Sequence, residues 1–152
     1  MAEPHIEITR TFDLPASALF EAWTNPELLA TWLAERATVD LRVGRQYRLE
    51  SDGDDEMPGL HLCSGSYQII EPNRRIVKTW SYDGPMAVEP LQTLVTVELR
   101  AVDTDEVEMV FREEGPMLTD PDENALAVEA WTSAFDELED VLLDEYGDED
   151  DE

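Results

Sequence analysis

Hydrophobic and polar residues alternate with a period of two over much of the chain, a pattern typical of β-strands with one buried face. Residues 91–102 alternate strongly, with Val95, Val97 and Leu99 on one face, and residues 107–111 repeat the pattern. The other segments with strand character are residues 5–13, 37–43, 45–51, 60–70 and 75–82. Asn, Asp, Gly and Pro fill the short stretches between most of them, so neighbouring strands are expected to pair antiparallel. The pattern predicts an antiparallel sheet of about six to seven strands.

Two short helices are predicted between the first strand and the rest of the sheet. Residues 16–23 show apolar residues at helical spacing, directly after a proline. Asn25 can cap a second helix that starts at Pro26, where a missing N–H costs nothing. The break is therefore expected to be a corner at which Trp23 and Trp32 both turn toward a shared core.

A long amphipathic helix is predicted from about residue 122 to residue 146. Its apolar stripe is expected to contain Leu126, Ala130, Ser133 or Ala134, Leu138, Val141 and Leu142, with Trp131 and Phe135 beside it. A sheet with one apolar face needs a cover, and this helix is the obvious cover. We expect an α+β fold in which a curved sheet surrounds the C-terminal helix and leaves a cavity beside it.

The length of the chain fits one domain, which we expect to occupy residues 1–146. Residues 147–152 form an acidic run with nothing to bury and are expected to be disordered. Cys63 is the single cysteine, so no internal disulfide can form. The first residues lack the apolar run of a signal peptide, and no stretch approaches the ~20 apolar residues that span a bilayer. A cytoplasmic location is expected.

The chain is strongly acidic, with 37 acidic against 10 basic residues and a net charge of −27. Phosphate backbones and anionic membrane surfaces would be repelled, so neither nucleic acid nor a membrane is an expected partner. Lys78 is the only lysine. Scarce lysine and abundant Asp and Glu resemble halophilic proteins, in which high salt screens the self-repulsion. A solvated coat that only keeps the protein soluble is the alternative interpretation.

Five blocks of the sequence, in this order, resemble one known family: FDLPASALFEAWTNPELLATWL, VDLRVGRQYRLE, GSYQIIEPNRRIVKTW, VTVELRAVD and AWTSAFDELEDVL. It is the family named for the activator of the ninety-kilodalton heat-shock protein ATPase, within the START-like (SRPBCC) superfamily. The resemblance covers about residues 6–143 and implies the helix-grip fold. It also implies a cavity function, because relatives in the superfamily bind lipids, sterols, polyketides or plant hormones there, and a few are cyclases or hydrolases. The eukaryotic co-chaperone carries this domain beside another that contacts the chaperone.

Two positions depart from the pattern of the family. Relatives often have two glycines in the turn where this chain has Gly44 and Arg45, so Arg45 is expected to be strained if that position needs a positive φ. Lys78 stands where relatives usually have an apolar or aromatic residue.

The residues expected to line the cavity are Trp32, His61, Cys63, Tyr67, Trp80, Met86, Met109, Phe111, Met117, Trp131 and Phe135. Plain packing is the competing interpretation, since buried aromatic and thioether side chains mostly fill space. The loops at 83–90 and 114–121 are the expected entrance. His61 and Cys63 share one face of a strand with Tyr67 and Ile69, but two donors do not complete a metal site. No metal or other cofactor is expected.

Three functions stay open at this point. Binding of a small apolar or amphipathic molecule in the cavity is favoured. A co-chaperone-like protein interaction would require a contiguous exposed apolar patch. An enzyme of the cyclase or hydrolase kind would require a titratable group with a perturbed pKa inside the cavity. No nucleophile elbow or phosphate-binding loop is present, so no catalytic residue is assigned, and the sequence does not determine the oligomeric state.

Overall fold

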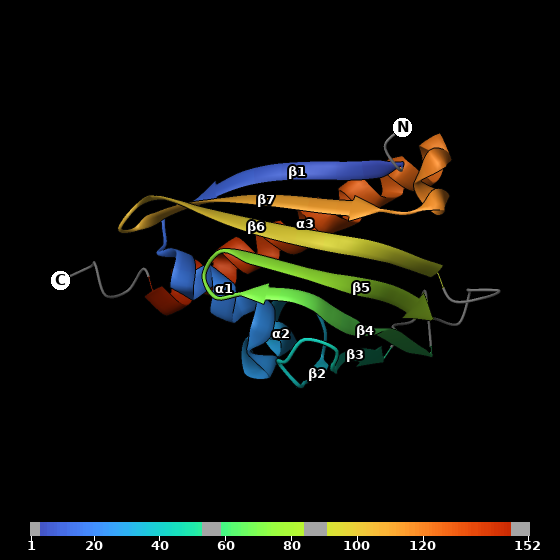
Figure 1. Ribbon diagram of the computed structural model, residues 1–152, viewed down its shortest axis with the longest axis horizontal. Coiled ribbons are helices and arrows are strands. Elements are labelled where there is room, and N and C mark those ends of the chain that lie inside the picture. The colour runs from blue at the N-terminus through green and yellow to red at the C-terminus, as the bar shows by residue number, and fades with distance from the viewer. Residues whose placement is uncertain (1–3, 53–58, 84–90, 147–152) are drawn as a thin grey trace.

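Seven strands, three α-helices and one 3₁₀ helix make up the part of the chain that the computed structural model describes, residues 4–52, 59–83 and 91–146 (Figure 1). In chain order the strands are β1 (His5–Phe12), β2 (Arg36–Val39), β3 (Gln46–Asp52), β4 (Leu60–Glu71), β5 (Arg75–Asp83), β6 (Leu91–Asp103) and β7 (Glu106–Glu114). The helices are α1 (Ala16–Thr24), α2 (Pro26–Trp32), the 3₁₀ helix η1 (Pro116–Thr119) and α3 (Pro121–Tyr146). The acidic tail at 147–152 lies outside the described residues, so the predicted domain limit remains a prediction.

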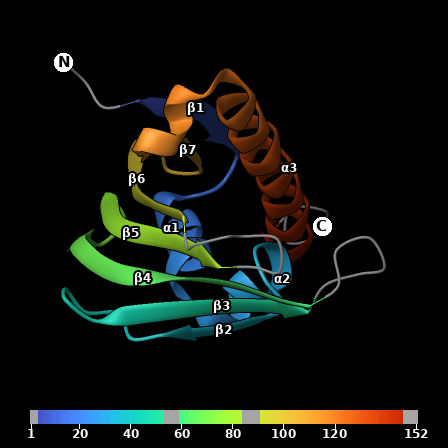
Figure 2. The same cartoon turned by 90° about the vertical axis from the view of Figure 1, so that its right-hand side faces the viewer.

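The strands form one antiparallel sheet in the order β1-β7-β6-β5-β4-β3-β2. Strands β2 to β7 follow one another as a meander, and β1 joins the free edge of β7. The sheet is curved, and α3 crosses its concave side (Figure 2). This is the α+β helix-grip arrangement that the sequence predicted.

Strand β2 is shorter than predicted, because it ends at Val39 rather than near residue 43. The carboxylate of Asp40 accepts hydrogen bonds from Arg42 at 2.8 Å and Arg45 at 2.9 Å, which stabilise a turn instead. Gly44 has a φ of 85° in this turn. Among the described residues Asn73 alone has a positive φ without being glycine, so the strain expected at Arg45 is absent.

The set of β4 side chains that point toward the core changes at a β-bulge, which the alternation did not predict. Tyr67 pairs with Lys78, but Ile69 pairs with Val77, so Gln68 is an extra residue. An extra residue in one strand reverses which side chains face the core beyond it. Ile70 therefore packs against the core, and the prediction that Ile69 continues the face of Tyr67 was wrong.

The corner between α1 and α2 is built as predicted. The side chain of Asn25 accepts a hydrogen bond from the backbone N–H of Glu27 at 2.9 Å, and Pro26 begins the helix. The indoles of Trp23 and Trp32 meet edge to face, with ring centroids 4.9 Å apart. Both are buried, so the corner directs both indoles into one core.

Helix α3 covers the concave face with a stripe different from the one predicted. Its buried residues are Trp131, Phe135, Leu138 and Leu142, whereas Leu126 is 59% exposed and Ala130 is also exposed. Leu126 and Ala130 were assigned to the wrong face, because the stripe follows the bulky aromatic residues. Arg10 of β1 fixes the helix from the sheet edge, with its guanidinium 2.7 Å from Asp136 and 2.9 Å from Glu139.

Candidate functional site

Lys78 lies in the interior between the sheet and α3. Alternation along β5 places it between Ile76 and Trp80 on the concave face, and it is 1% exposed. Its Nζ lies 4.5 Å from the ring centroid of Tyr47, 5.1 Å from that of Trp23 and 5.6 Å from that of Trp80. No hydrogen bond or ion pair joins it to another residue of the described ranges. Burial lowers the pKa of Lys78 to about 7, because an ammonium loses its hydration there.

Tyr67 lies directly opposite Lys78 on β4, so both side chains project from the same face. Its hydroxyl is buried and finds no hydrogen-bond partner among the described residues. The neighbouring Tyr47, also buried, donates its hydroxyl to the backbone oxygen of Thr79 at 2.5 Å. Burial raises the pKa of both phenols above the usual value, so both stay protonated. Within the described ranges, Tyr67 is therefore an unused donor, and it lies beside an amine that finds no acceptor there.

Glu113 is a second buried charged residue of this interior. It is 5% exposed, and each of its carboxylate oxygens accepts one hydrogen bond. Thr93 of β6 donates at 2.7 Å, and the indole N–H of Trp131 donates at 2.9 Å. Glu113 thereby ties β6 and β7 to α3, and its hydrogen bonds are already used within the protein.

Cys63 and His61 lie on the same face nearer the start of β4. Burial raises the pKa of the Cys63 thiol to about 12, so it stays protonated and unreactive. His61 Nδ1 lies 2.7 Å from the hydroxyl of Tyr82. Among the residues in the described ranges, no three His, Cys, Asp or Glu side chains come together as metal ligands would.

Most of the residues predicted to line a cavity do lie in this interior. Phe111, Trp131 and Phe135 form a ring cluster with centroid separations of 4.5 to 5.8 Å, and Trp80 lies 5.1 Å from Trp131. Two others have packing contacts: Met109 accepts the indole N–H of Trp23 at 3.4 Å, and Trp32 donates to the backbone oxygen of Ala22 at 3.0 Å.

Two predicted cavity residues cannot be placed. Met86 and the side chain of Met117 lie outside what the structure describes. Contact with a ligand stays a prediction for the whole predicted set.

The sequence reasoning did not select the two buried charged residues of the site. The signal was present in the alternation: Lys78 lies between Ile76 and Trp80, and Glu113 lies two positions beyond Phe111. From the sequence, Lys78 stood out only as a departure from the family pattern, and nothing singled out Glu113 among the 37 acidic residues.

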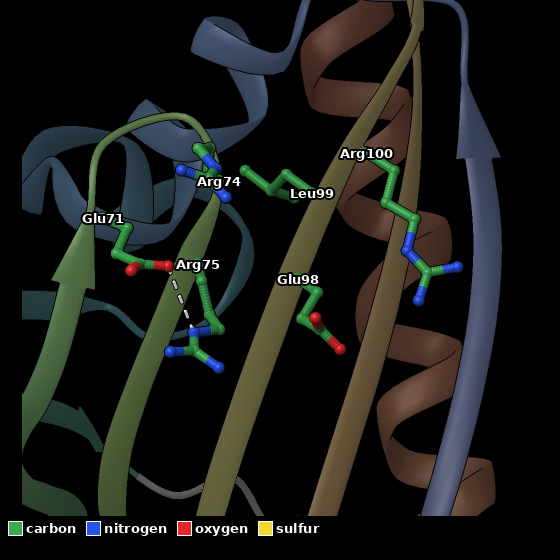
Figure 3. Close-up of a pocket in the computed structure, with 6 residues that line it drawn as sticks. All are labelled: Glu71, Arg74, Arg75, Glu98, Leu99 and Arg100. Atoms are coloured by element: carbon green, nitrogen blue, oxygen red, sulfur yellow. Dashed lines mark ion pairs between the residues drawn. The ribbon is translucent and has the colours of Figure 1, made fainter.

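Two hollows lined by described residues lie away from this interior. One of about 440 Å³ is lined by Glu71, Arg74, Arg75, Glu98, Leu99 and Arg100 (Figure 3). It lies on the side of the sheet away from α3, and its ion pair joins Arg75 to Glu71 at 3.2 Å. The other, of about 350 Å³, lies at the β2–β3 turn. Neither is apolar or covered, so we take the interior around Lys78 as the candidate site; the predicted cavity there stays a prediction.

The sheet, the helix across its concave face and the polar groups between them define a helix-grip protein. A family model described as "Activator of Hsp90 ATPase homolog 1-like protein" matches residues 13–143, and the chain belongs to this family. No curated protein matches the sequence. No helix within the described ranges combines the length and apolarity needed to cross a membrane.

Solved structures with the same fold are distant in sequence. A protein from Rhodobacter sphaeroides superposes with a TM-score of 0.77 at 21% identity, covering 93% of each chain. DynU16, from the dynemicin biosynthetic locus, gives 0.74 at 19% identity; the match covers 96% of this chain and 49% of that one, about half its length. An HSP90 activator from Plasmodium falciparum gives 0.57 at 26% identity, covering 72% of this chain and 71% of its own.

Proposed function

We propose that the protein binds a small, mainly apolar molecule between the concave face of the sheet and α3. The observation that carries the proposal is the buried hydroxyl of Tyr67, which has no hydrogen-bond partner among the described residues and lies directly opposite the buried amine of Lys78. No described residue makes a hydrogen bond or ion pair with that amine either. A ligand oxygen would satisfy both groups at once. The class of ligand is therefore an apolar molecule with one oxygen-bearing polar group.

The energetics of the interior favour such a ligand. An unpaired buried polar group costs about 1–3 kcal/mol, so an acceptor that reaches Lys78 or Tyr67 regains part of that cost. The surrounding rings of Trp23, Tyr47 and Trp80 supply apolar area for the rest of the molecule. Ligand sites generally combine an apolar wall with a few polar groups that fix orientation.

Two of the compared structures bear on the proposal, and they point to different functions. DynU16 shares the fold and comes from a biosynthetic locus, which fits a protein that handles small molecules. The likeness to an HSP90 activator supports the alternative, a chaperone partner. Among the described residues the large exposed apolar side chains are Leu41, Val43, Val102, Leu126 and Val128. They come from three different parts of the fold: the β2–β3 turn, the end of β6 and helix α3.

Fluorescence titration tests the proposal, because the four tryptophans of the chain lie in or beside the interior. We expect 2-naphthoate to quench them and to bind at least tenfold more tightly than naphthalene. The titration is done in concentrated KCl, since the charge of −27 would otherwise repel an anion. Lys78→Met should abolish the preference for the acid.

Arg100→Met is the matched control, because it removes one positive charge from the hollow on the opposite side of the sheet. Binding in the interior leaves this variant unchanged. Loss of binding in Arg100→Met with none in Lys78→Met would place the ligand in the outer hollow and overturn the proposal. No quenching by either compound would also overturn it.

A further inference from the structure

We propose that Lys78 is a nucleophilic amine that forms an imine with the aldehyde or ketone group of an apolar molecule held in this interior. The inference rests on the proposed function, and it names the chemistry of the ligand's polar group. The site would then bind its ligand through a reversible covalent bond to Lys78.

The first support is the isolation of Lys78 from acids in a chain that is full of them. Eight of the nine arginines form ion pairs within the described ranges, although most are exposed. Lys78 is the only lysine, is buried, and has no such pair with a described residue. A carboxylate partner would strongly stabilise the protonated form of the amine, whereas the surrounding aromatic rings stabilise it more weakly.

The second support is the set of titratable groups that face the same interior. They are Tyr47 on β3, Cys63 and Tyr67 on β4, and Glu113 on β7. Burial raises the pKa values of the two phenols and the thiol, so they add no negative charge at neutral pH. Glu113 is the carboxylate of this set, but Thr93 and Trp131 engage both of its oxygens, and no ion pair joins it to Lys78.

Burial without an ion pair therefore favours the neutral amine. With its pKa lowered to about 7, roughly half of Lys78 is unprotonated at neutral pH, against fewer than about one in a thousand for an exposed lysine. A desolvated lysine in an apolar pocket is an activated nucleophile.

The chemical step balances without an external oxidant or reductant. The lone pair of Nζ forms a C–N bond to the carbonyl carbon, and the carbonyl π pair moves to oxygen. A proton passes from nitrogen to that oxygen, giving a carbinolamine. The carbinolamine hydroxyl then takes a second proton and leaves as water as the C–O bond breaks, and the nitrogen lone pair forms the C=N bond. The nitrogen gives up its remaining proton, which replaces the proton donated to the leaving oxygen. The Tyr67 hydroxyl is the available donor for the oxygen in both stages, because no described residue occupies it.

Reductive trapping tests the inference. The protein is incubated with 2-naphthaldehyde and sodium cyanoborohydride at neutral pH in concentrated KCl, and the adduct is located by peptide mass spectrometry. With one lysine in the chain, the N-terminal amine is the main competitor. Trypsin no longer cleaves after a modified lysine, so an adduct at Lys78 joins the two flanking peptides.

We expect Lys78 in the folded protein to be trapped at least tenfold faster than the same residue in urea. Tyr67→Phe should slow trapping several-fold, whereas Tyr47→Phe, which removes a phenol hydroxyl already paired with Thr79, should change it little. Bound 2-naphthoate should block the reaction. Glyceraldehyde, a polar aldehyde, should label the N-terminus in preference to Lys78.

The outcomes separate the two proposals. Quenching by naphthoate together with adducts at the N-terminus alone overturns the imine and leaves the binding function standing. Absence of both quenching and trapping overturns both. Equal trapping of folded and unfolded Lys78 also overturns the imine, and this comparison uses the natural chain, so it does not depend on how any variant folds.

Discussion

Replacing Lys78 with methionine should stabilise the protein at neutral pH. The substitution keeps a side chain of similar length and removes the one buried amine. The pKa of Lys78 falls from 10.5 to about 7 on folding, and this shift destabilises the folded state by about 5 kcal/mol when the amine is protonated in the unfolded chain. Lys78→Met removes this penalty and gains that free energy. Part of that gain is offset by the lost cation–π contacts, about 2 kcal/mol. We expect the free energy of unfolding at pH 7 to rise by about 3 kcal/mol.

The pH dependence gives the sharper test. Between the folded and unfolded pKa values of Lys78, the unfolded chain binds more protons than the folded one, so stability rises with pH. The penalty is complete below about pH 7 and disappears above about pH 10.5. From pH 7 to pH 9 the natural protein should gain about 2 kcal/mol relative to Lys78→Met. Cys63 and the buried tyrosines act in the opposite direction above pH 9, but they are present in both proteins.

Urea unfolding at fixed KCl, followed by far-ultraviolet circular dichroism at half-unit steps of pH, measures the difference. Parallel curves for the two proteins would refute the reasoning, because they would mean that Lys78 keeps its charge in the folded state. A destabilised Lys78→Met would likewise mean that the ammonium has a strong partner in the interior.

The remaining predictions concern the neighbours of Lys78 and the charge of the whole chain. Tyr67→Phe should leave stability unchanged or raise it by about 1 kcal/mol, whereas Tyr47→Phe should lower it by about 1 kcal/mol, because only Tyr47 loses a hydrogen bond; urea midpoints in the reverse order would contradict this. Gly65→Ala should cost more than about 2 kcal/mol, since the added Cβ would lie 2.0 Å from the backbone oxygen of Thr79; an unchanged melting temperature would show that β4 yields there. Raising KCl from 0.1 M to 2 M should raise the melting temperature by several degrees, because salt screens the net charge of −27; a flat response in scanning calorimetry would argue against adaptation to salt.

Most of the fold could be predicted because it depends on local patterns. Period-two alternation located the seven strands, and the Asn25-Pro26 pair located the corner between α1 and α2. The errors lie where tertiary contacts decide. One extra residue in β4 moved Ile70, not Ile69, to the core, and alternation contains no signal for such a bulge.

The same limit applies to α3 and to the site. Leu126 suits a stripe by spacing, but it lies on the solvent face of the helix, whereas the next residue, Ala127, packs against the core. Lys78 and Glu113 occupy core positions by alternation, although charged side chains are rarely buried. Residues that contradict a local rule are often functional, which is why the site had to be found in the structure.

The charge of Lys78 in the folded protein can be measured directly, because the chain has one lysine. Protein grown with ε-¹³C-lysine gives a single lysine signal by nuclear magnetic resonance, which can be titrated with pH and then with 2-naphthoate. We expect a midpoint near pH 7 and a clear shift of the signal when the ligand is added. A midpoint near 10.5 with no response to the ligand would contradict an interior built to receive one.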